Sequence, residues 1–447
     1  MNNLNRRDFI RKSTIVSAGA ILAPVILNSC SSKAVPSDRL NVAFIGAGGK
    51  GFHAIQILVN SPMMNIVALA DVDDNRAAET YKFLPKVRHF TDFRKMFDKM
   101  GDQIDAVVVS TPDHTHHYIA KYCMLKGKHV YLEKPLAHNI REVRDLMKME
   151  KETGLACQMG NQGHSGSGIK QLNDWIERGF LGEVNEVHAW TVVGWNNAKA
   201  KRPEKQRIPS GLDWDLWIGP ATMVPYNKAY CPAEWRGWND FGLGALGDWA
   251  CHNMDAPYFA LGLECPEKVE VESTGPSELA FPESAKITYS FPSGKYNTPV
   301  KLTWYQGDVY KPFRPVQLEE GRQLGNNGGG TVIVGSKATV MMSSHASSPV
   351  FIPASKHAEM EQMITKTQEP GAWNGHYDNW LKACRGEEKT SSSFEYGGSL
   401  TETMLFGNMA LRTNSGFNIN TVTKEIINNK GASEFIGYPE PRNGWEI

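Results

Sequence analysis

A glycine-rich turn between an apolar strand and a helix constrains the fold of this chain more than any other segment. Residues 40–54 read LNVAFIGAGGKGFHA, so Gly46, Gly48 and Gly51 end the strand and open the helix. The first glycine permits a tight turn, the second lets the backbone approach a bound group, and the third lets helix and strand pack closely. Unpaired N–H groups at the helix start attract anions. The segment predicts a βα unit that holds the phosphates of a dinucleotide.

An acidic residue follows at the spacing that such a unit requires. Asp71 ends the second apolar run, NIVALAD, about 20 residues after the glycines. A carboxylate there accepts hydrogen bonds from the adenosine ribose and repels a 2′-phosphate, which favours NAD over NADP as the cofactor. Arg76 is a candidate to stack on adenine, with a solvated helix residue as the alternative.

Strands alternate with helices through the first part of the chain. The apolar runs LNVAFIG, NIVALAD, AVVVST and HVYLEKP are separated by helical segments, which predicts a parallel sheet covered on both faces. After about residue 165, runs such as EVNEVHAWTVVGW and AKITYSFP follow one another with turn residues between them. We therefore expect an α/β protein with a doubly wound Rossmann domain at 39–160. A substrate-binding and oligomerisation α/β domain with a large, mainly antiparallel open sheet is expected at 161–447.

Two opposite charges and a proline stand where the strand HVYLEKP ends. In a doubly wound sheet, ligands bind outside the carboxyl ends of the strands. Glu133 and Lys134 are therefore predicted to reach the cofactor, and Lys134 also its substrate, while Pro135 starts the next helix without needing an N–H. The alternative is a surface ion pair at a strand-to-helix turn, which contributes little stability.

A second polar cluster is predicted in the segment DFGLGALGDWACHNMDAPYFAL, residues 240–261. Asp248, His252 and Asp255 are four and three residues apart, which places them on one face of a helix. Just before it, Trp235 and Arg236 are candidate sugar contacts, because an indole face suits the apolar face of a sugar ring and a guanidinium bonds hydroxyls. Core packing is the alternative for the tryptophans of this region.

The glycine turn, Asp71, STPDHTHH at 110–117 and LEKPLA at 132–137 together resemble the Gfo/Idh/MocA family. Members are two-domain, NAD(P)-dependent oxidoreductases that act mostly on sugars, cyclitols and related diols. The resemblance implies that Lys134 polarises or deprotonates a substrate hydroxyl. It also implies that Asp248 orients the substrate and that His252 acts as general acid and base with Lys134. An imidazole, whose unperturbed pKa is ~6.5, suits proton transfer near neutral pH.

The same resemblance assigns further residues. Ser110, Thr111 and His114 match a loop that lines the cofactor, with helix capping or exposure as the alternative for its histidine. Many relatives carry an arginine where this chain reads QMGNQGHSG, so Gln162 and His164 are predicted substrate contacts. Asp255 is a third, with support of a helix end as the alternative. No metal site is predicted.

The implied reaction is hydride transfer at a secondary hydroxyl of a sugar, glycoside or cyclitol. Two alternatives remain open. One is an NAD-dependent glycosidase or epimerase that acts through a transient keto-sugar, and the other is a catalytically inactive, lipid-anchored sugar-binding protein. That glycosidase branch departs from the E-K-P tripeptide, so Lys134 favours the ordinary oxidoreductase.

Residues 1–29 carry an export pattern. Arg6 and Arg7 precede an apolar run that extends to Leu27, as in a twin-arginine signal peptide. The run stops just before Cys30, which resembles a lipoprotein cleavage site; an incidental cysteine is the alternative. We expect an exported, periplasmic protein that touches the membrane only through a lipid anchor at Cys30, with 30–38 as a tether. Because no free NAD pool is expected there, the cofactor is expected to stay bound and be recycled.

Charge and cysteine content bound the remaining partners. Basic and acidic residues balance at 48 each and form no basic stripe after residue 29, which argues against a nucleic-acid partner. A small-molecule sugar is the expected partner, and the family resemblance implies a homo-oligomer, a dimer or a tetramer. The cysteines beyond the leader show no C-x-x-C pair and are predicted to be buried without disulfides.

Overall fold

The structure is a computed structural model that describes residues 39–195, 201–363 and 372–447. Arg6, Arg7 and Cys30 lie outside these residues, so the leader and the lipid anchor stay predictions. Within the described ranges, no helix has the length and apolar character needed to cross a bilayer. The six described cysteines are all free thiols, and three of them, Cys123, Cys157 and Cys251, are buried.

Six parallel strands form the first sheet, in the order β3-β2-β1-β4-β5-β6. The order reverses between β1 and β4, where sheets of this kind bind their ligands. All four residues of β4 are buried, as expected for a strand covered on both faces. The strands are β1 (Leu40–Ile45), β2 (Met64–Ala70), β3 (Arg88–Phe90), β4 (Ala106–Val109), β5 (His129–Glu133) and β6 (Cys157–Gly160).

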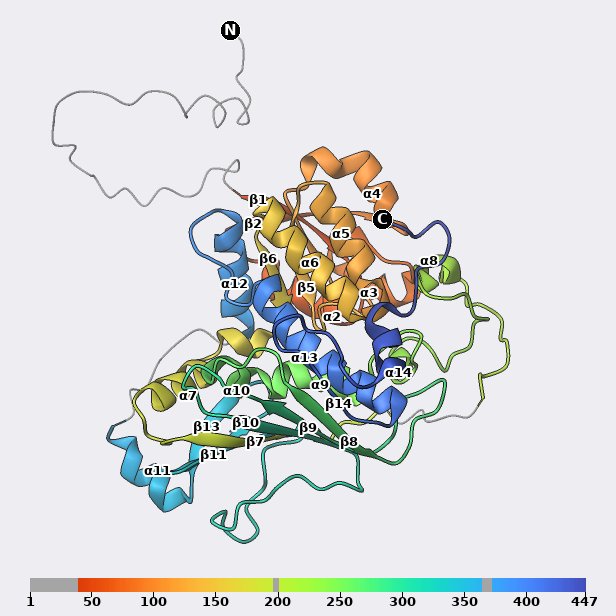
Figure 1. The fold of residues 1–447 in the computed structure, drawn as a ribbon. Helices are drawn as coiled ribbons and strands as arrows, with labels where there is room; N and C mark the ends of the chain where they lie inside the picture. The colour runs from red at the N-terminus through yellow and green to blue at the C-terminus, as the bar shows by residue number, and fades with distance from the viewer. Residues whose placement is uncertain (1–38, 196–200, 364–371) are drawn as a thin grey trace, which may run out of the picture. The chain divides into compact units, whose positions relative to one another are not determined.

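Helices cover both faces of this sheet. In α6, buried residues recur every three or four positions from Ile140 to Met149, Asn139 caps the first turn, and Gly154 ends the helix in the left-handed region. Figure 1 shows α4, α5 and α6 over one face. The helices are α2 (Lys50–Leu58), α3 (Asp74–Phe83), α4 (Phe93–Met100), α5 (His116–Leu125) and α6 (Ile140–Thr153), with short 3₁₀ turns η2 (Gly101–Gln103) and η3 (Asp113–Thr115).

Eight strands form the second sheet, in the order β13-β12-β11-β7-β10-β9-β8-β14. Among the strands that the structure describes in this sheet, only β7 and β10 pair in parallel, so the predicted fold class is confirmed. Burial alternates along β9, so one face of the sheet is packed and the other is more open. The strands are β7 (Val184–Trp190), β8 (Lys268–Ser273), β9 (Ala285–Phe291), β10 (Val300–Gln306), β11 (Gly330–Gly335), β12 (Thr339–Ser343), β13 (Ser347–Ile352) and β14 (Phe417–Asn418). An oligomer through the open face stays a prediction.

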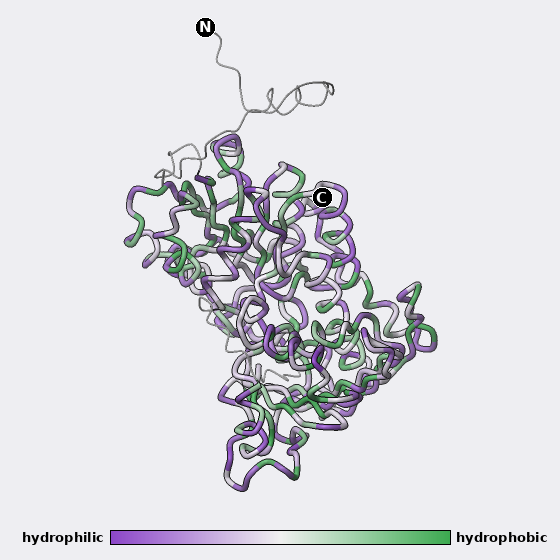
Figure 2. Tube along the Cα trace, turned by 90° about the vertical axis from the view of Figure 1, so that its left-hand side faces the viewer, coloured by the Kyte–Doolittle hydropathy of each residue, from purple (hydrophilic) through white to green (hydrophobic). Residues whose placement is uncertain are grey.

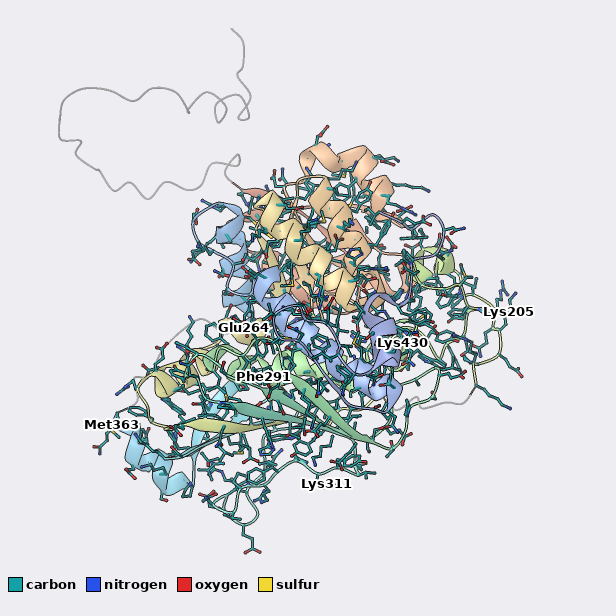
Figure 3. The ribbon with its side chains drawn as sticks, in the orientation of Figure 1. Lys205, Glu264, Phe291, Lys311, Met363 and Lys430 are labelled. Carbon is teal, nitrogen blue, oxygen red and sulfur yellow. The ribbon has the colours of Figure 1, made fainter. Side chains whose placement is uncertain are left out.

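Helices α9, α10 and α13 lie between the two sheets (Figure 1). Phe291, at the end of β9, lies inside this layer, whereas Lys205 and Lys311 project outward in Figure 3. Figure 2 shows hydrophobic runs through the interior and a largely hydrophilic loop at the lower end. The helices are α7 (Ser167–Glu177), α8 (Trp214–Ile218), α9 (Gly244–Asn253), α10 (Asp255–Ala260), α11 (Ala354–Glu361), α12 (Ala372–Cys384), α13 (Phe394–Thr413) and α14 (Lys430–Ser433), with turns η4 (Gln162–Ser165), η5 (Glu234–Gly237) and η6 (Glu434–Gly437).

The end of the chain returns to the first sheet. Tyr377, Trp380 and Leu381 of α12 share a buried cluster with Val42 and Phe44 of β1. Helix α13 packs against α6 and β6 on one side and against α9 and β8 on the other. Residues 39–447 form one compact unit, and the predicted domain boundary at residue 160 stays a prediction.

Candidate active site

The turn after β1 leaves no room for side chains at the predicted glycines. A Cβ at Gly51 would lie 1.8 Å from the carbonyl oxygen of Gly46, and one at Gly48 would lie 2.6 Å from that of Arg76. Gly46 has φ +84°, a conformation that favours glycine. No side chain caps the start of α2, so the positive end of its dipole faces the turn. A bare backbone cradle at a helix start fits a dinucleotide pyrophosphate.

The Asp71 carboxylate holds the glycine turn in place through hydrogen bonds to its backbone. Its Oδ2 accepts hydrogen bonds from the N–H groups of Ala47 (2.8 Å) and Gly48 (2.9 Å), and its Oδ1 accepts one from Asp73 (3.0 Å). Burial raises the pKa of this carboxyl, while the three N–H groups oppose the shift. Asp71 lines the cavity beside Arg76, but its Oδ2 is committed to the turn. Only Oδ1 retains capacity for the predicted ribose contact, which stays a prediction.

A cavity of about 350 Å³ extends from the glycine turn to α9, within the usual size range of small-molecule sites. The predicted cofactor-binding residues of the first sheet and the predicted substrate-binding residues at 235–252 therefore line the same cavity. The predicted residues that line it are Gly46, Gly48, Asp71, Arg76, Ser110, Thr111, Glu133, Lys134, Trp235, Arg236, Asp248 and His252.

Lys134 and Asp248 form a direct ion pair in this cavity. Lys134 Nζ donates to Asp248 Oδ1 at 2.7 Å and to its backbone oxygen at 2.6 Å. Trp195 Nε1 donates to Asp248 Oδ2 at 2.8 Å, and Arg236 Nε approaches Oδ1 at 3.3 Å. Burial opposes ionisation of Asp248, yet the charges of Lys134 and Arg236 hold its pKa well below the usual value. Asp248 is therefore an ionised acceptor that orients Lys134, whereas the sequence predicted an orienter of substrate.

His252 lies beside a second imidazole. Its ring centroid is 4.2 Å from that of His345, which also lines the cavity. Burial, followed by the neighbouring His345 and Lys134, lowers the pKa of His252 well below 6.5, and burial lowers that of His345 to about 4. The pKa of His252 is therefore displaced from the unperturbed imidazole value of ~6.5, because the ring is buried beside the Lys134 ammonium. His252 is neutral, and its buried Nδ1 has no partner within the described residues.

Sequence reasoning missed several residues of this wall. His345 comes from the turn between β12 and β13 and has φ +60°, which is rare for a residue other than glycine. Asp113 is 5% exposed, and burial raises its pKa to about 7. Lys50 lies 3.6 Å from Glu133 and over the ring of Trp373. Lys50 lies inside the glycine turn and Asp113 inside the segment STPDHTHH. Their place in these two motifs was therefore the sequence signal that could have identified them as site residues.

His114 does not line the cavity. Its ring nitrogens contact the backbone oxygens of Phe241 (3.3 Å) and Trp217 (3.0 Å), and burial lowers its pKa to about 4. Its ring therefore ties the Ser110–Thr111 loop to the segments that follow α7, in contrast to the predicted cofactor contact. Gly51, whose role is helix packing, is likewise absent from the cavity wall.

Gln162, His164 and Asp255 also lie away from the cavity wall, in contrast to their predicted substrate contacts. His164 Nδ1 lies 2.9 Å from Asp255 Oδ1, which also accepts a hydrogen bond from Tyr396. Gln162 Nε2 donates to Tyr131 and Glu133. Helix α9 ends at Asn253 and α10 begins at Asp255, so the helix face of Asp248 and His252 does not continue. His164 and Asp255 thus belong to one interior polar cluster with Tyr396, and Gln162 belongs to another with Tyr131 and Glu133.

The later chain also covers the nucleotide end of the cavity. Leu212 forms an antiparallel bridge with Asp73, flanked by hydrogen bonds from Asp74 N to Gly211 O and from Asp213 N to Val72 O, both 2.8 Å. Trp217 and Trp445 also line the cavity. Residues that follow the first sheet in the sequence thus enclose part of the predicted cofactor site.

Comparison with known proteins gives two family matches. Residues 40–161 match the model "Oxidoreductase family, NAD-binding Rossmann fold", and residues 165–298 match "Oxidoreductase family, C-terminal alpha/beta domain". Together these matches span more than half of the chain.

Curated relatives match part of the chain. A "Glycosyl hydrolase family 109 protein 1" from Shewanella sp. (strain ANA-3) is 27% identical over 208 residues, which is 41% of this chain and 45% of that protein. An "Alpha-N-acetylgalactosaminidase" from Shewanella oneidensis is 26% identical over the same shares. The match thus spans less than half the length of these relatives.

Solved structures match over most of the described fold. The WlbA dehydrogenase from Bordetella pertussis, in complex with NADH and UDP-GlcNAcA, has a TM-score of 0.59 at 17% identity, covering 86% of this chain and 99% of that one. An inositol dehydrogenase homolog from Azotobacter vinelandii, complexed with NADH and myo-inositol, has a TM-score of 0.58 at 17% identity, covering 86% and 98%. At these identities the matches show a shared fold.

Proposed function

The chain belongs to the Gfo/Idh/MocA oxidoreductase family, and from that premise we propose that it transfers a hydride at a secondary hydroxyl of a sugar, glycoside or cyclitol. The family assignment confirms the predicted oxidoreductase class and NAD as the cofactor. One observation carries the substrate proposal: Lys134, Asp248 and His252 share a cavity with the glycine turn.

We assign separate roles in the reaction to Lys134 and His252. A bound nicotinamide supplies the hydride acceptor. The Lys134 ammonium has three N–H donors, of which two bind Asp248, and the third is free to polarise the substrate hydroxyl. His252 is the proposed acceptor of the hydroxyl proton, because its imidazole is neutral and its Nδ1 has no partner within the described residues. Trp235 supplies an indole surface for the sugar ring.

Retention of the cofactor is part of the proposal. The bridge at Leu212 and the tryptophans at 217 and 445 enclose the nucleotide end of the cavity, which supports slow release. Slow release matches the export pattern at Arg6 and Arg7, because an exported enzyme has no external NAD pool to draw on. Periplasmic location and lipid attachment at Cys30 are proposed on the same pattern.

A second candidate function is glycoside cleavage or epimerisation through a transient keto-sugar. The similarity to the family 109 glycosyl hydrolases supports it, although the match spans less than half of those proteins. His345 supports it as well, because abstraction of a proton beside the new ketone needs a base besides the one that deprotonates the hydroxyl. This cycle leaves the cofactor unchanged overall.

One experiment separates these candidates. The purified full-length protein is denatured, and the supernatant is assayed for stoichiometric NAD. The native protein is then mixed with mono- and disaccharides while the absorbance of reduced nicotinamide and the release of aglycone are followed. Stable reduction without aglycone release supports the oxidoreductase, and aglycone release without net reduction supports the glycosidase. Sugar binding with neither change, and with no epimer of the sugar formed, indicates the inactive sugar-binding alternative.

A further inference from the structure

Two cations share a single carboxylate at the substrate end of the cavity. Lys134 Nζ lies 2.7 Å and Arg236 Nε 3.3 Å from the same oxygen, Asp248 Oδ1. The other oxygen, Oδ2, accepts from the neutral indole of Trp195. One negative charge therefore faces two positive charges, which leaves one positive charge in excess.

The other titratable groups of this wall remove at most part of this excess positive charge. Lys50 and Glu133 form their own pair at 3.6 Å. His252 and His345 are neutral, because burial lowers the pKa of both rings. Asp71 and Asp73 accept backbone N–H groups, and Asp92 pairs with Arg94. Asp113 forms no ion pair with Arg236 or Lys134 within the described residues. Burial raises its pKa to about 7, so it is only partly ionised near neutral pH.

Contacts with two indoles and two hydrogen bonds fix the orientation of the Arg236 guanidinium. It lies between two indoles, 4.3 Å from the ring centroid of Trp235 and 5.1 Å from that of Trp195. Nε approaches Asp248, and Nη1 donates to the backbone oxygen of Ala233 at 3.3 Å. Nη2 donates no hydrogen bond within the described residues, although Arg236 lines the cavity. Stacking fixes the plane of the fork before a ligand arrives, which lowers the entropic cost of binding.

We propose that the substrate is a sugar acid whose carboxylate binds Arg236, an assignment that rests on the proposed function of the same cavity. A planar guanidinium pairs with a carboxylate through charge-assisted hydrogen bonds. The excess of one charge matches a carboxylate better than a phosphate monoester, which carries about −1.5 to −2 at pH 7. The ring hydroxyls then face Lys134 and His252.

A different role for the extra charge is stabilisation of the alkoxide as the hydroxyl loses its proton. That role acts on every substrate and changes kcat, whereas recognition of a carboxylate acts on acidic substrates and changes affinity. The two roles therefore predict different patterns for one pair of sugars.

The test uses methyl β-glucuronide and methyl β-glucoside, which differ only by a carboxylate or a CH₂OH at C6, with glucose 6-phosphate as the phosphate probe. Binding to the purified, cofactor-loaded protein is measured by titration calorimetry, so the result does not depend on turnover. We expect the wild type to bind the glucuronide at least about tenfold more tightly than the glucoside. Arg236→Gln removes this preference, and Arg236→Lys retains part of it. Arg385→Gln, a change in a surface pair with Glu387, leaves it intact.

Each outcome decides between the proposals. Equal affinity for the two glycosides, or tighter binding of glucose 6-phosphate than of the glucuronide, overturns the sugar-acid assignment and leaves the oxidoreductase intact. An unchanged preference in Arg236→Gln overturns the assignment to this residue. A glucuronide preference that depends on Arg236, without reduction of the cofactor by any sugar, supports the inference and contradicts the proposed hydride transfer. Thermal unfolding of each variant confirms that it is folded.

Discussion

The exchange Asp248→Asn tests how the ion pair acts in catalysis. Asparagine keeps the shape of the side chain but removes the charge. Its amide N–H₂ is a donor, so it cannot accept the hydrogen bond that Lys134, Trp195 or Arg236 donates at that position. Loss of one hydrogen bond to a charged group costs about 1.5–3 kcal/mol. If that energy is expressed in the transition state, kcat/KM falls by roughly ten- to a hundredfold.

A double-mutant cycle shows whether Asp248 works through Lys134. Lys134→Ala is expected to lower kcat/KM strongly, and Asp248→Asn is expected to cost less than about threefold when added to it, because its main partner is already gone. The rate is followed by the absorbance of reduced nicotinamide with an oxidisable sugar, and thermal unfolding corrects for loss of fold. Asp240→Asn, which removes a charge paired with Arg202 outside the cavity wall, serves as the control. A full additional loss in the Lys134→Ala background would refute the reasoning, since the two residues would then act independently.

Three further predictions concern the cradle, the interior polar cluster of Asp255 and pH. Gly51→Ala is expected to lower both melting temperature and NAD content, because its Cβ would meet Gly46 O at 1.8 Å; Gly101→Ala, whose Cβ meets only Phe97 at 3.5 Å, leaves both unchanged. Asp255→Ala removes an acceptor shared by buried His164 and Tyr396 and is expected to destabilise the fold by about 3–5 kcal/mol in denaturant unfolding, while activity per folded molecule persists. The pKa of fully buried His114 and His116 falls to about 4, so the unfolded state binds more protons below pH ~6.5, and stability is lost as pH falls from there toward 4. Each of these histidines contributes about 1.4 kcal/mol per pH unit in that window, which a series of melting temperatures against pH measures; a flat series contradicts their burial in the neutral form.

Features encoded by neighbouring residues could be predicted from the sequence. The tight turn at Gly46 and Gly51, the order of strands and helices, and the charged end of β5 each depend on a few consecutive positions. The scarcity of helices between the strand-like runs after about residue 165 also distinguished the mainly antiparallel sheet from the parallel one, because parallel strands need long crossover connections.

Features created by distant contacts could not be predicted. His345 reaches His252 from a turn 93 residues away, and Trp195 reaches Asp248 from the end of the segment after β7. Nothing local marks either residue as part of the site. Asp255 was predicted to contact the substrate but lies in the interior, because the helix is interrupted at Met254. Residue spacing alone does not show such a break.

The central claim is that Lys134 acts on a substrate held against a nicotinamide in this cavity. Its most direct test is the rate at which an oxidisable sugar reduces the cofactor bound to the purified protein, compared between wild type and Lys134→Ala at equal NAD content. We predict rapid appearance of reduced nicotinamide in the wild type and a rate at least about a hundredfold lower in the variant. Equal rates in the two proteins would contradict the account.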